Sequence, residues 1–223
     1  MSEKKYGSTL AEVFANAARR FDGLPAFCRK DKSGSFVPLG FRELYEKGLD
    51  LATALIGLGV EAREHVGLIA DNRLEWIICD YGILLAGAAD VPRGTDITDT
   101  EMVYILTHSD ARVVFVENAT ILRRLLEHRA QLPNLREIIV MATGETLPEG
   151  VRHLENLIAD GAARRAAGVD VALQRARAIR PEDLFTIIYT SGTTGTPKGV
   201  QLTHSNMCSQ IENLPLDLHP GDR

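Results

Sequence analysis

The sequence predicts an α/β protein with a largely parallel β-sheet that carries helices on both faces. Short runs of β-branched residues recur along the chain, and amphipathic segments of helical length separate most of them. The hydrophobic fraction of 45% and the charged fraction of 25% are ordinary for a globular protein. Strands that alternate with helices favour right-handed crossovers and a sheet that is covered on both faces.

The elements are predicted from periodicity and from end signals. Capping-box patterns begin at Thr9 and Thr98, Gly59 is placed to end a helix, and Asp71 or Asn72 is predicted to cap another. The predicted strands are 26–29, 36–39, 65–70, 88–92, 112–117, 137–141, 184–189 and 200–203. The predicted helices are 10–20, 41–58, 76–85, one that begins at Thr98, 120–129, 154–167 with 169–177 extending or following it, and 207 to about 214.

Composition and charge exclude several classes of protein. The net charge is -5, and the basic residues are scattered among acidic ones, which argues against nucleic-acid binding. No segment is predicted to cross a membrane, and the first residues carry no secretory signal. Cys28, Cys79 and Cys208 have no metal-like spacing, and their apolar neighbours predict buried free thiols in a cytoplasmic protein.

The most informative stretch is the twelve-residue motif from Tyr189 to Val200, which we expect to be a loop between two strands. Its glycines allow successive backbone N–H groups to turn toward one point, its hydroxyls add donors, and Lys198 adds a positive charge. No carboxylate lies in the motif, so it suits a polyphosphate. The predicted phosphate-binding residues are Thr190, Ser191, Gly192, Thr193, Thr194, Gly195 and Lys198.

Two other interpretations of the motif are weaker. A generic hairpin turn needs one or two glycines, not five hydroxyl side chains and a lysine among three glycines. The common P-loop requires Gly before the Lys, Ser or Thr after it, and then a helix. Here Pro197 and Gly199 flank Lys198, and a strand follows.

The motif resembles the phosphate-binding signature of the adenylate-forming enzymes, which include acyl-CoA synthetases, luciferases and adenylation domains. The stretches 71–76, 86–94 and 108–112 are similar to those of bacterial long-chain fatty acyl-CoA synthetases, although Leu74 stands where those relatives usually carry proline. The resemblance extends from about Thr9 to the end of the chain.

The resemblance implies a two-step reaction. A fatty acid carboxylate attacks the α-phosphate of ATP, normally with Mg²⁺, to give an acyl-adenylate and pyrophosphate; the thiol of coenzyme A then displaces AMP. It also implies adenine, metal and ribose segments and a C-terminal domain, none of which occurs before Arg223. The chain is therefore expected to be an incomplete N-terminal part of the large domain, with no catalytic residue and no metal ligand of its own, and inactive alone.

Within 1–223 we expect a scaffold at 9–180, a strand–phosphate loop–strand unit at 184–203, and a helix with a truncated linker at 204–223. A sheet cut at an internal strand should self-associate. His204 either approaches the ligand or only begins a helix. Three functions stay open: a fatty acid–CoA ligase, peripheral at the membrane or not; an adenylating enzyme with another acid or a carrier-protein acceptor; and a non-catalytic nucleotide-binding module.

Overall fold

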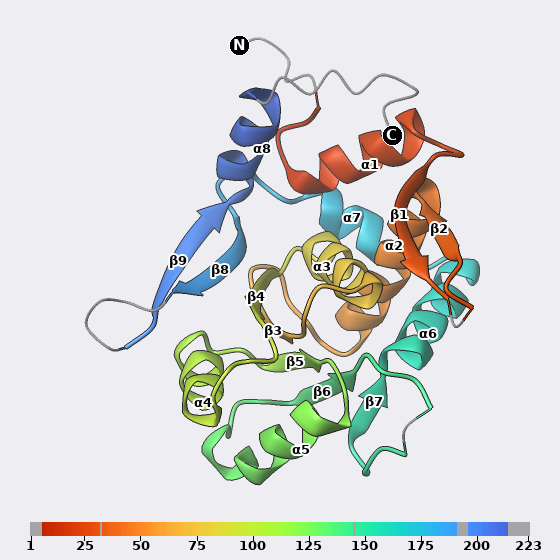
Figure 1. Ribbon diagram of the computed structural model, residues 1–223. Coiled ribbons are helices and arrows are strands. Elements are labelled where there is room, and N and C mark those ends of the chain that lie inside the picture. Colours follow the sequence, from red (N-terminus) through yellow and green to blue (C-terminus); the bar gives the residue numbers. More distant parts are fainter. Residues whose placement is uncertain (1–5, 32, 145, 191–195, 214–223) are drawn as a thin grey trace.

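A seven-stranded mixed β-sheet forms the centre of the chain in the computed structural model, which describes residues 6–31, 33–144, 146–190 and 196–213 (Figure 1). Its strands are β3 (His65–Ile69), β4 (Ala89–Arg93), β5 (Val113–Val116), β6 (Glu137–Val140), β7 (Val151–His153), β8 (Leu184–Thr190) and β9 (Lys198–Thr203). The spatial order is β7-β6-β5-β3-β4-β8-β9. Every neighbouring pair is parallel except β8 and β9, so the prediction of a largely parallel sheet is confirmed.

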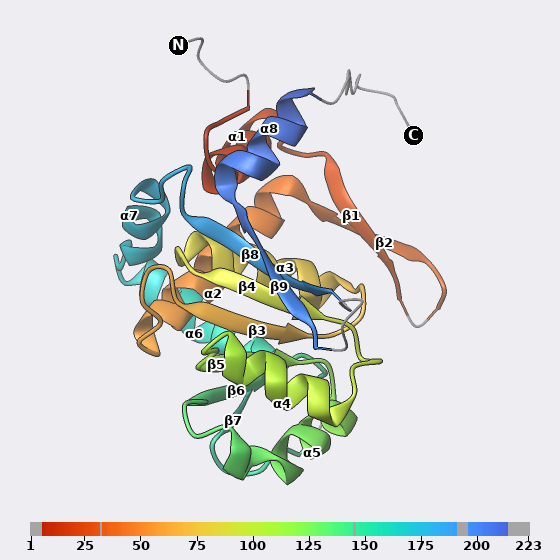
Figure 2. The same cartoon turned by 90° about the vertical axis from the view of Figure 1, so that its left-hand side faces the viewer.

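Helices cover both faces of this sheet, as predicted. They are α1 (Leu10–Arg20), α2 (Phe41–Gly57), α3 (Leu74–Leu85), α4 (Asp99–His108), α5 (Ala119–Glu127), the short η1 (Arg129–Gln131), α6 (Leu154–Ala166), α7 (Val171–Arg177) and α8 (His204–Asn213). Buried residues of α2, α3, α6 and α7 share one core with one face of the sheet. Those of α4 and α5 share a second core with the other face (Figure 2).

The alternation of side chains along β5 explains why there are two cores. All four residues of this strand are buried, but successive side chains point to opposite faces. Val113 and Phe115 pack into the core under α2 and α3, whereas Val114 and Val116 pack into the core under α4 and α5. A strand buried on both faces has no polar position, which is why it forms a continuous apolar run in the sequence.

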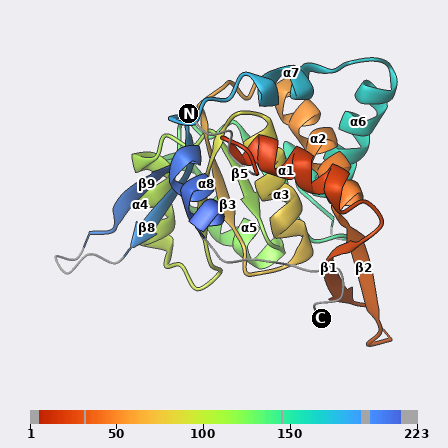
Figure 3. The same ribbon diagram turned by 90° about the horizontal axis from the view of Figure 1, so that it is seen from above.

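A separate two-stranded hairpin, β1 (Pro25–Lys30) and β2 (Phe36–Gly40), lies on the opposite side of the molecule from β8 and β9 (Figure 1 and Figure 3). The hairpin itself is confirmed, but most of its residues are exposed, and Phe36 is 68% exposed. Cys28 on β1 is exposed too. The prediction of three buried thiols is therefore right for Cys79 and Cys208 and wrong for Cys28, because only the end of the hairpin near Ala26 and Leu39 packs on the core and Cys28 lies beyond it.

The helix caps show where the local sequence is sufficient to predict how a helix begins. The capping box at Thr98 is complete, with both reciprocal hydrogen bonds to Glu101 present. At Thr9 the side chain caps α1, but the carboxylate of Glu12 accepts from the N–H of Ser8 rather than from Thr9. Neither Asp71 nor Asn72 caps α3, because that helix begins after an extended Arg73 with no side-chain cap.

Two features lie in the region where the sequence pattern is weak. The short strand β7 joins the edge of the sheet beside β6 and was not predicted. Of the two alternatives for 169–177, the structure shows a second helix that follows the first, because Gly168 adopts φ = +88° between α6 and α7. A left-handed residue ends a helix, and glycine adopts that conformation without steric cost.

The packing of α6 against α2 depends on one small residue. A Cβ atom placed on Gly161 of α6 would lie 1.8 Å from the backbone oxygen of Asp50 on α2. Arg165, one turn further along α6, donates to the carboxylates of Asp50 and Glu46 at 2.6 and 2.7 Å. The two helices thus approach at backbone contact and are joined by an ion-pair cluster at the same crossing.

Candidate functional site

The phosphate motif begins at the end of β8 and ends at the start of β9. In this antiparallel pair Thr190 stands opposite Lys198, and Tyr189 stands opposite Gly199. Thr190 and Lys198 are both exposed, and Lys198 forms no ion pair with any described residue. The structure thus places Thr190 and Lys198 opposite each other at the ends of the two strands, where the motif leaves and re-enters the sheet. Lys198 lies on β9 itself, whereas the sequence predicted it within the loop.

Ser191, Gly192, Thr193, Thr194 and Gly195 lie outside the described residues, so their predicted role as phosphate ligands stays a prediction.

Tyr189 fixes the strand that leads into the motif. Its ring is buried, its hydroxyl lies 2.6 Å from Nδ1 of His108 at the end of α4, and Tyr104 meets the ring edge-on. Burial raises the pKa of the Tyr189 hydroxyl. A Cβ atom on Gly199 would lie 3.1 Å from the Tyr189 ring, so the neighbouring strand needs a glycine at this point. The motif therefore starts from a rigid, packed residue.

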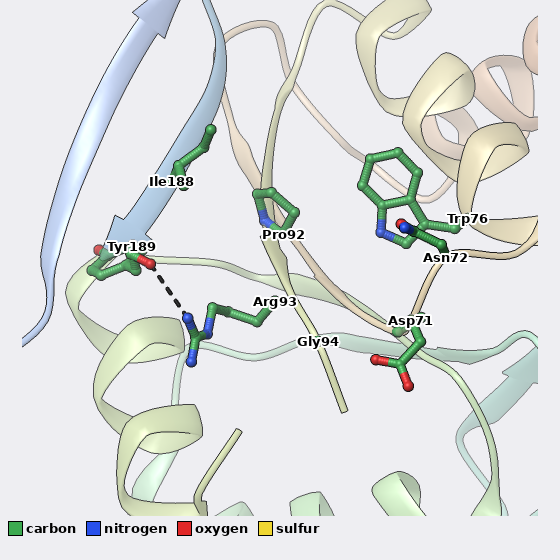
Figure 4. Close-up of a pocket in the computed structure, with 9 residues that line it drawn as sticks. Asp71, Asn72, Trp76, Pro92, Arg93, Gly94, Ile188 and Tyr189 are labelled. Carbon is green, nitrogen blue, oxygen red and sulfur yellow. Dashed lines mark hydrogen bonds between the residues drawn. The ribbon is translucent and has the colours of Figure 1, made fainter. Parts of the chain in front are cut away.

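A cavity of about 640 Å³ lies at the carboxyl ends of β3, β4 and β8 (Figure 4). Its lining residues are Ala70, Asp71, Asn72, Trp76, Pro92, Arg93, Gly94, Ile188 and Tyr189. The chain leaves β3 through α3, which covers one face of the sheet, and leaves β4 through α4, which covers the other. The cavity therefore lies at the point where the crossovers diverge, and ligands of open α/β sheets bind at such switch points. We call it the switch-point crevice.

Hydrogen bonds of Asp71 hold one wall of this crevice. Its carboxylate accepts from the backbone N–H and the hydroxyl of Thr95, at 2.9 and 2.6 Å, and its own N–H donates to Glu117 at 2.8 Å. The bonds from Thr95 hold the pKa of Asp71 below its usual value. These contacts join the loops that follow β3, β4 and β5. Asp71 is thus committed to the loops rather than to the start of α3.

Arg93 forms the opposite wall, at the last position of β4. Its Nη1 donates to the carbonyl oxygen of Tyr189 at 3.4 Å (Figure 4). Arg93 is not among the site residues predicted from the sequence. Its position after a predicted strand of the parallel sheet was the available signal, because the carboxyl ends of parallel strands carry the ligand-binding residues.

His204 does not belong to this site. It is 1% exposed at the start of α8, and its Nδ1 accepts a hydrogen bond from the backbone N–H of Leu10 at 3.2 Å. Burial lowers the pKa of His204 to about 4. The length of β9 separates it from Lys198. Of the two alternatives for His204, the helix-start role is therefore the correct one.

Two observations concern metals and membranes. Within the parts of the chain that the structure describes, no group of three His, Cys, Asp or Glu side chains could hold a metal ion. None of the described helices combines the length and the apolar character that crossing a bilayer requires.

The fold and site define an α/β class of protein with a crevice at the switch point of the sheet and a Gly- and Thr-rich motif beside it. The family model of the AMP-binding enzymes matches residues 14–223, and the chain therefore belongs to this family of adenylate-forming ligases.

Fatty acid ligases are among its relatives. The chain is 35% identical over 189 residues to a chloroplastic long-chain-fatty-acid–[acyl-carrier-protein] ligase of Arabidopsis thaliana, covering 80% of this chain and 26% of that protein. It is 37% identical over 178 residues to a long-chain-fatty-acid–CoA ligase of Mycobacterium tuberculosis, covering 77% and 28%. The chain thus spans about a quarter of the length of these curated relatives.

Solved structures agree with the fold. The anthranilate CoA ligase determined in complex with anthranoyl-AMP matches with a TM-score of 0.70 and 28% identity, over 89% of this chain and 36% of that one. A putative long-chain-fatty-acid CoA ligase from Rhodopseudomonas palustris matches with a TM-score of 0.71 at 20% identity, over 91% and 46%, which supports the fold alone.

Proposed function

We propose that this chain is the phosphate-binding part of an ATP-dependent acid–thiol ligase that converts a long-chain fatty acid to an acyl-adenylate and then to acyl-CoA. The observation that carries the proposal is the motif from Tyr189 to Val200, with Thr190 and Lys198 opposite each other where it enters and leaves the sheet. The fatty acid ligases among the relatives support the substrate class.

The first step of the proposed reaction requires little acid–base chemistry from the residues of the motif. The attacking carboxylate is already an anion, so the first step needs in-line positioning and neutralised charge more than a general base. Lys198 would withdraw negative charge from the pyrophosphate as it leaves, and the motif hydroxyls and N–H groups would hold its oxygens. We expect Mg²⁺ to accompany ATP and to take its protein ligand from outside the described residues.

We further propose that the chain works as part of a longer enzyme, with 9–180 as scaffold, 184–203 as the phosphate unit and 204–223 leading onward. Adenine, ribose and acyl contacts would then come from outside the chain, and the 223 residues alone would form no thioester.

The first test is calorimetric titration of ATP, with and without Mg²⁺, into the wild-type chain and into Lys198→Ala. One charged hydrogen bond contributes about 1.5–3 kcal/mol, so Lys198→Ala should weaken ATP binding at least tenfold. Lys47→Ala is the matched control, since Lys47 is a half-buried lysine of α2 that lies outside the motif and pairs with Glu43. ATP binding that is equal in the wild type and Lys198→Ala would contradict the assignment.

A carrier-protein thiol is the second candidate acceptor, because the Arabidopsis relative is named as an acyl-carrier-protein ligase. The longer enzyme, supplied with a fatty acid and ATP, should release AMP in the presence of coenzyme A. AMP release only with a holo carrier protein would move the assignment to that acceptor. AMP release only with amino acids or aryl acids would exclude a fatty acid ligase.

A further inference from the structure

The side chain of Arg93 lies at the switch-point crevice and forms few hydrogen bonds with the described residues. Arg93 ends β4 at this crevice and lies outside the twelve-residue motif. Among the described residues, the only hydrogen bond of its side chain is the 3.4 Å contact to the Tyr189 carbonyl. Figure 4 shows its guanidinium on the Tyr189 side of the crevice, with Asp71, Asn72 and Trp76 on the other side. No described carboxylate lies within ion-pair distance of it.

The hydrogen bonding of this side chain is incomplete. The Nε atom of Arg93 is buried and has no hydrogen-bond partner among the described residues. A guanidinium carries five N–H donors, and a buried donor without a partner is costly. Other partly buried arginines are paired: Arg124 donates to Asp99 at 2.7 Å, and Arg165 donates to two carboxylates. Arg93 therefore has donors available for a ligand.

The surroundings of Arg93 select an anion. Asp71 is the carboxylate that shares the crevice, and it is already bonded to Thr95 rather than to Arg93. The planar fork of a guanidinium matches the oxygens of a phosphate or a carboxylate, and such bonds are strongest where water is excluded. The Tyr189 carbonyl that Arg93 contacts immediately precedes Thr190, the first predicted phosphate ligand.

We infer that Arg93 is a further substrate-binding residue, which holds an oxyanion of the ATP polyphosphate in the switch-point crevice beside the motif. This inference rests on the proposed function, because it requires that the motif binds ATP. Arg93 and Lys198 would then contact the polyphosphate from neighbouring parts of the sheet edge, and the Tyr189 carbonyl would hold the guanidinium in place before ATP arrives.

The test is calorimetric titration of the 223-residue chain with ATP, inorganic tripolyphosphate and adenosine, and separately with laurate below its micellar concentration. Arg93→Gln removes the charge, and Arg93→Lys keeps it without the fork. Arg152→Gln is the control, since Arg152 lies on β7 at the far edge of the sheet and pairs with Glu137. Thermal unfolding of each variant verifies that it is folded.

We expect Arg93→Gln to bind ATP and tripolyphosphate at least about tenfold more weakly than the wild type, with Arg93→Lys between them and Arg152→Gln unchanged. Equal ATP affinity in the wild type and in either folded Arg93 variant would overturn the inference while leaving the proposed function intact. Weakened laurate binding with unchanged ATP binding would overturn it too, because the anion would then be a carboxylate. A wild-type chain that binds neither ATP nor tripolyphosphate would overturn both.

Discussion

Asp90 gives the chain a pH-dependent weakness in the middle of its sheet. It lies on β4, is 2% exposed, and stands beside Thr186 of β8 in the parallel pairing. Its Oδ1 atom and the Thr186 hydroxyl oxygen are both buried, and among the described residues neither has a hydrogen-bond partner of normal geometry. The Thr186 hydroxyl lies near enough to lower the pKa of Asp90, but burial is the larger effect. Burial raises the pKa of the Asp90 carboxyl to about 7. Burial, followed by the nearby Asp90 charge, also raises the pKa of Asp80 on α3.

The sign of the effect follows from this shift. In the unfolded chain the pKa of Asp90 returns to its ordinary value of 3.8, so the folded state binds the proton more tightly. The stability that the protonated carboxyl contributes is fully present below about pH 4 and is lost as the pH rises through about 7. Each pKa unit is worth about 1.4 kcal/mol, so the difference between 3.8 and about 7 corresponds to about 4 kcal/mol.

Asp90→Asn removes the ionisation and keeps the shape of the side chain. The free energy of unfolding of Asp90→Asn, relative to that of the wild type, should increase by about 2–3 kcal/mol between pH 5 and pH 8. Any fixed packing difference between the two proteins cancels in this comparison. Urea unfolding of both proteins at unit pH intervals measures it. Asp160→Asn, which changes an exposed carboxyl on α6, is the control. If the free energy of unfolding changed with pH by the same amount in the wild type and in Asp90→Asn, the reasoning would be refuted.

Three further predictions concern packing and surface. Gly161→Ala should lower the free energy of unfolding, measured in urea, by more than about 3 kcal/mol, because the new methyl would meet the Asp50 backbone. Gly57→Ala is the control and should be neutral or stabilising, because its new methyl would meet only a flexible arginine side chain. Under native conditions Ellman's reagent should titrate Cys28 rapidly and the two buried cysteines only in denaturant; three fast thiols would contradict the fold. Light scattering should find dimers or larger species of the wild type, because Val200 is 45% exposed on the edge strand β9. Val200→Lys should abolish this association, and a wild type that stays monomeric at high concentration would contradict the prediction.

Local structure was predicted well where the interacting residues are close in sequence. The capping box at Thr98 needs only Glu101, three residues away, and it formed as expected. The β-branched run of β5 needs only burial on both faces, and the alternating pattern of strands and helices permits few sheet topologies. The motif between β8 and β9 was recognisable for the same reason, since its residue types lie side by side in the chain.

Predictions failed where a distant partner decided the outcome. Asp71 was expected to cap the next helix, but Thr95, 24 residues away, binds its carboxylate. Cys28 has apolar neighbours in sequence, yet it lies on a hairpin that the described residues leave exposed. His204 follows the motif closely in sequence, but a strand carries it to the amino end of α1. Sequence distance is a poor guide to spatial distance wherever a strand or a crossover intervenes.

The sequence by itself determined the α/β class, the order of most helices and strands, and the stretch that is proposed to bind phosphate. These depend on periodicity and on short contiguous patterns. Only the tertiary structure decided that β4 pairs with β8, and so that Arg93 meets the carbonyl of Tyr189, 96 residues away. Parallel pairing brings together residues on strands far apart in the chain, and no local pattern encodes which strand becomes the neighbour.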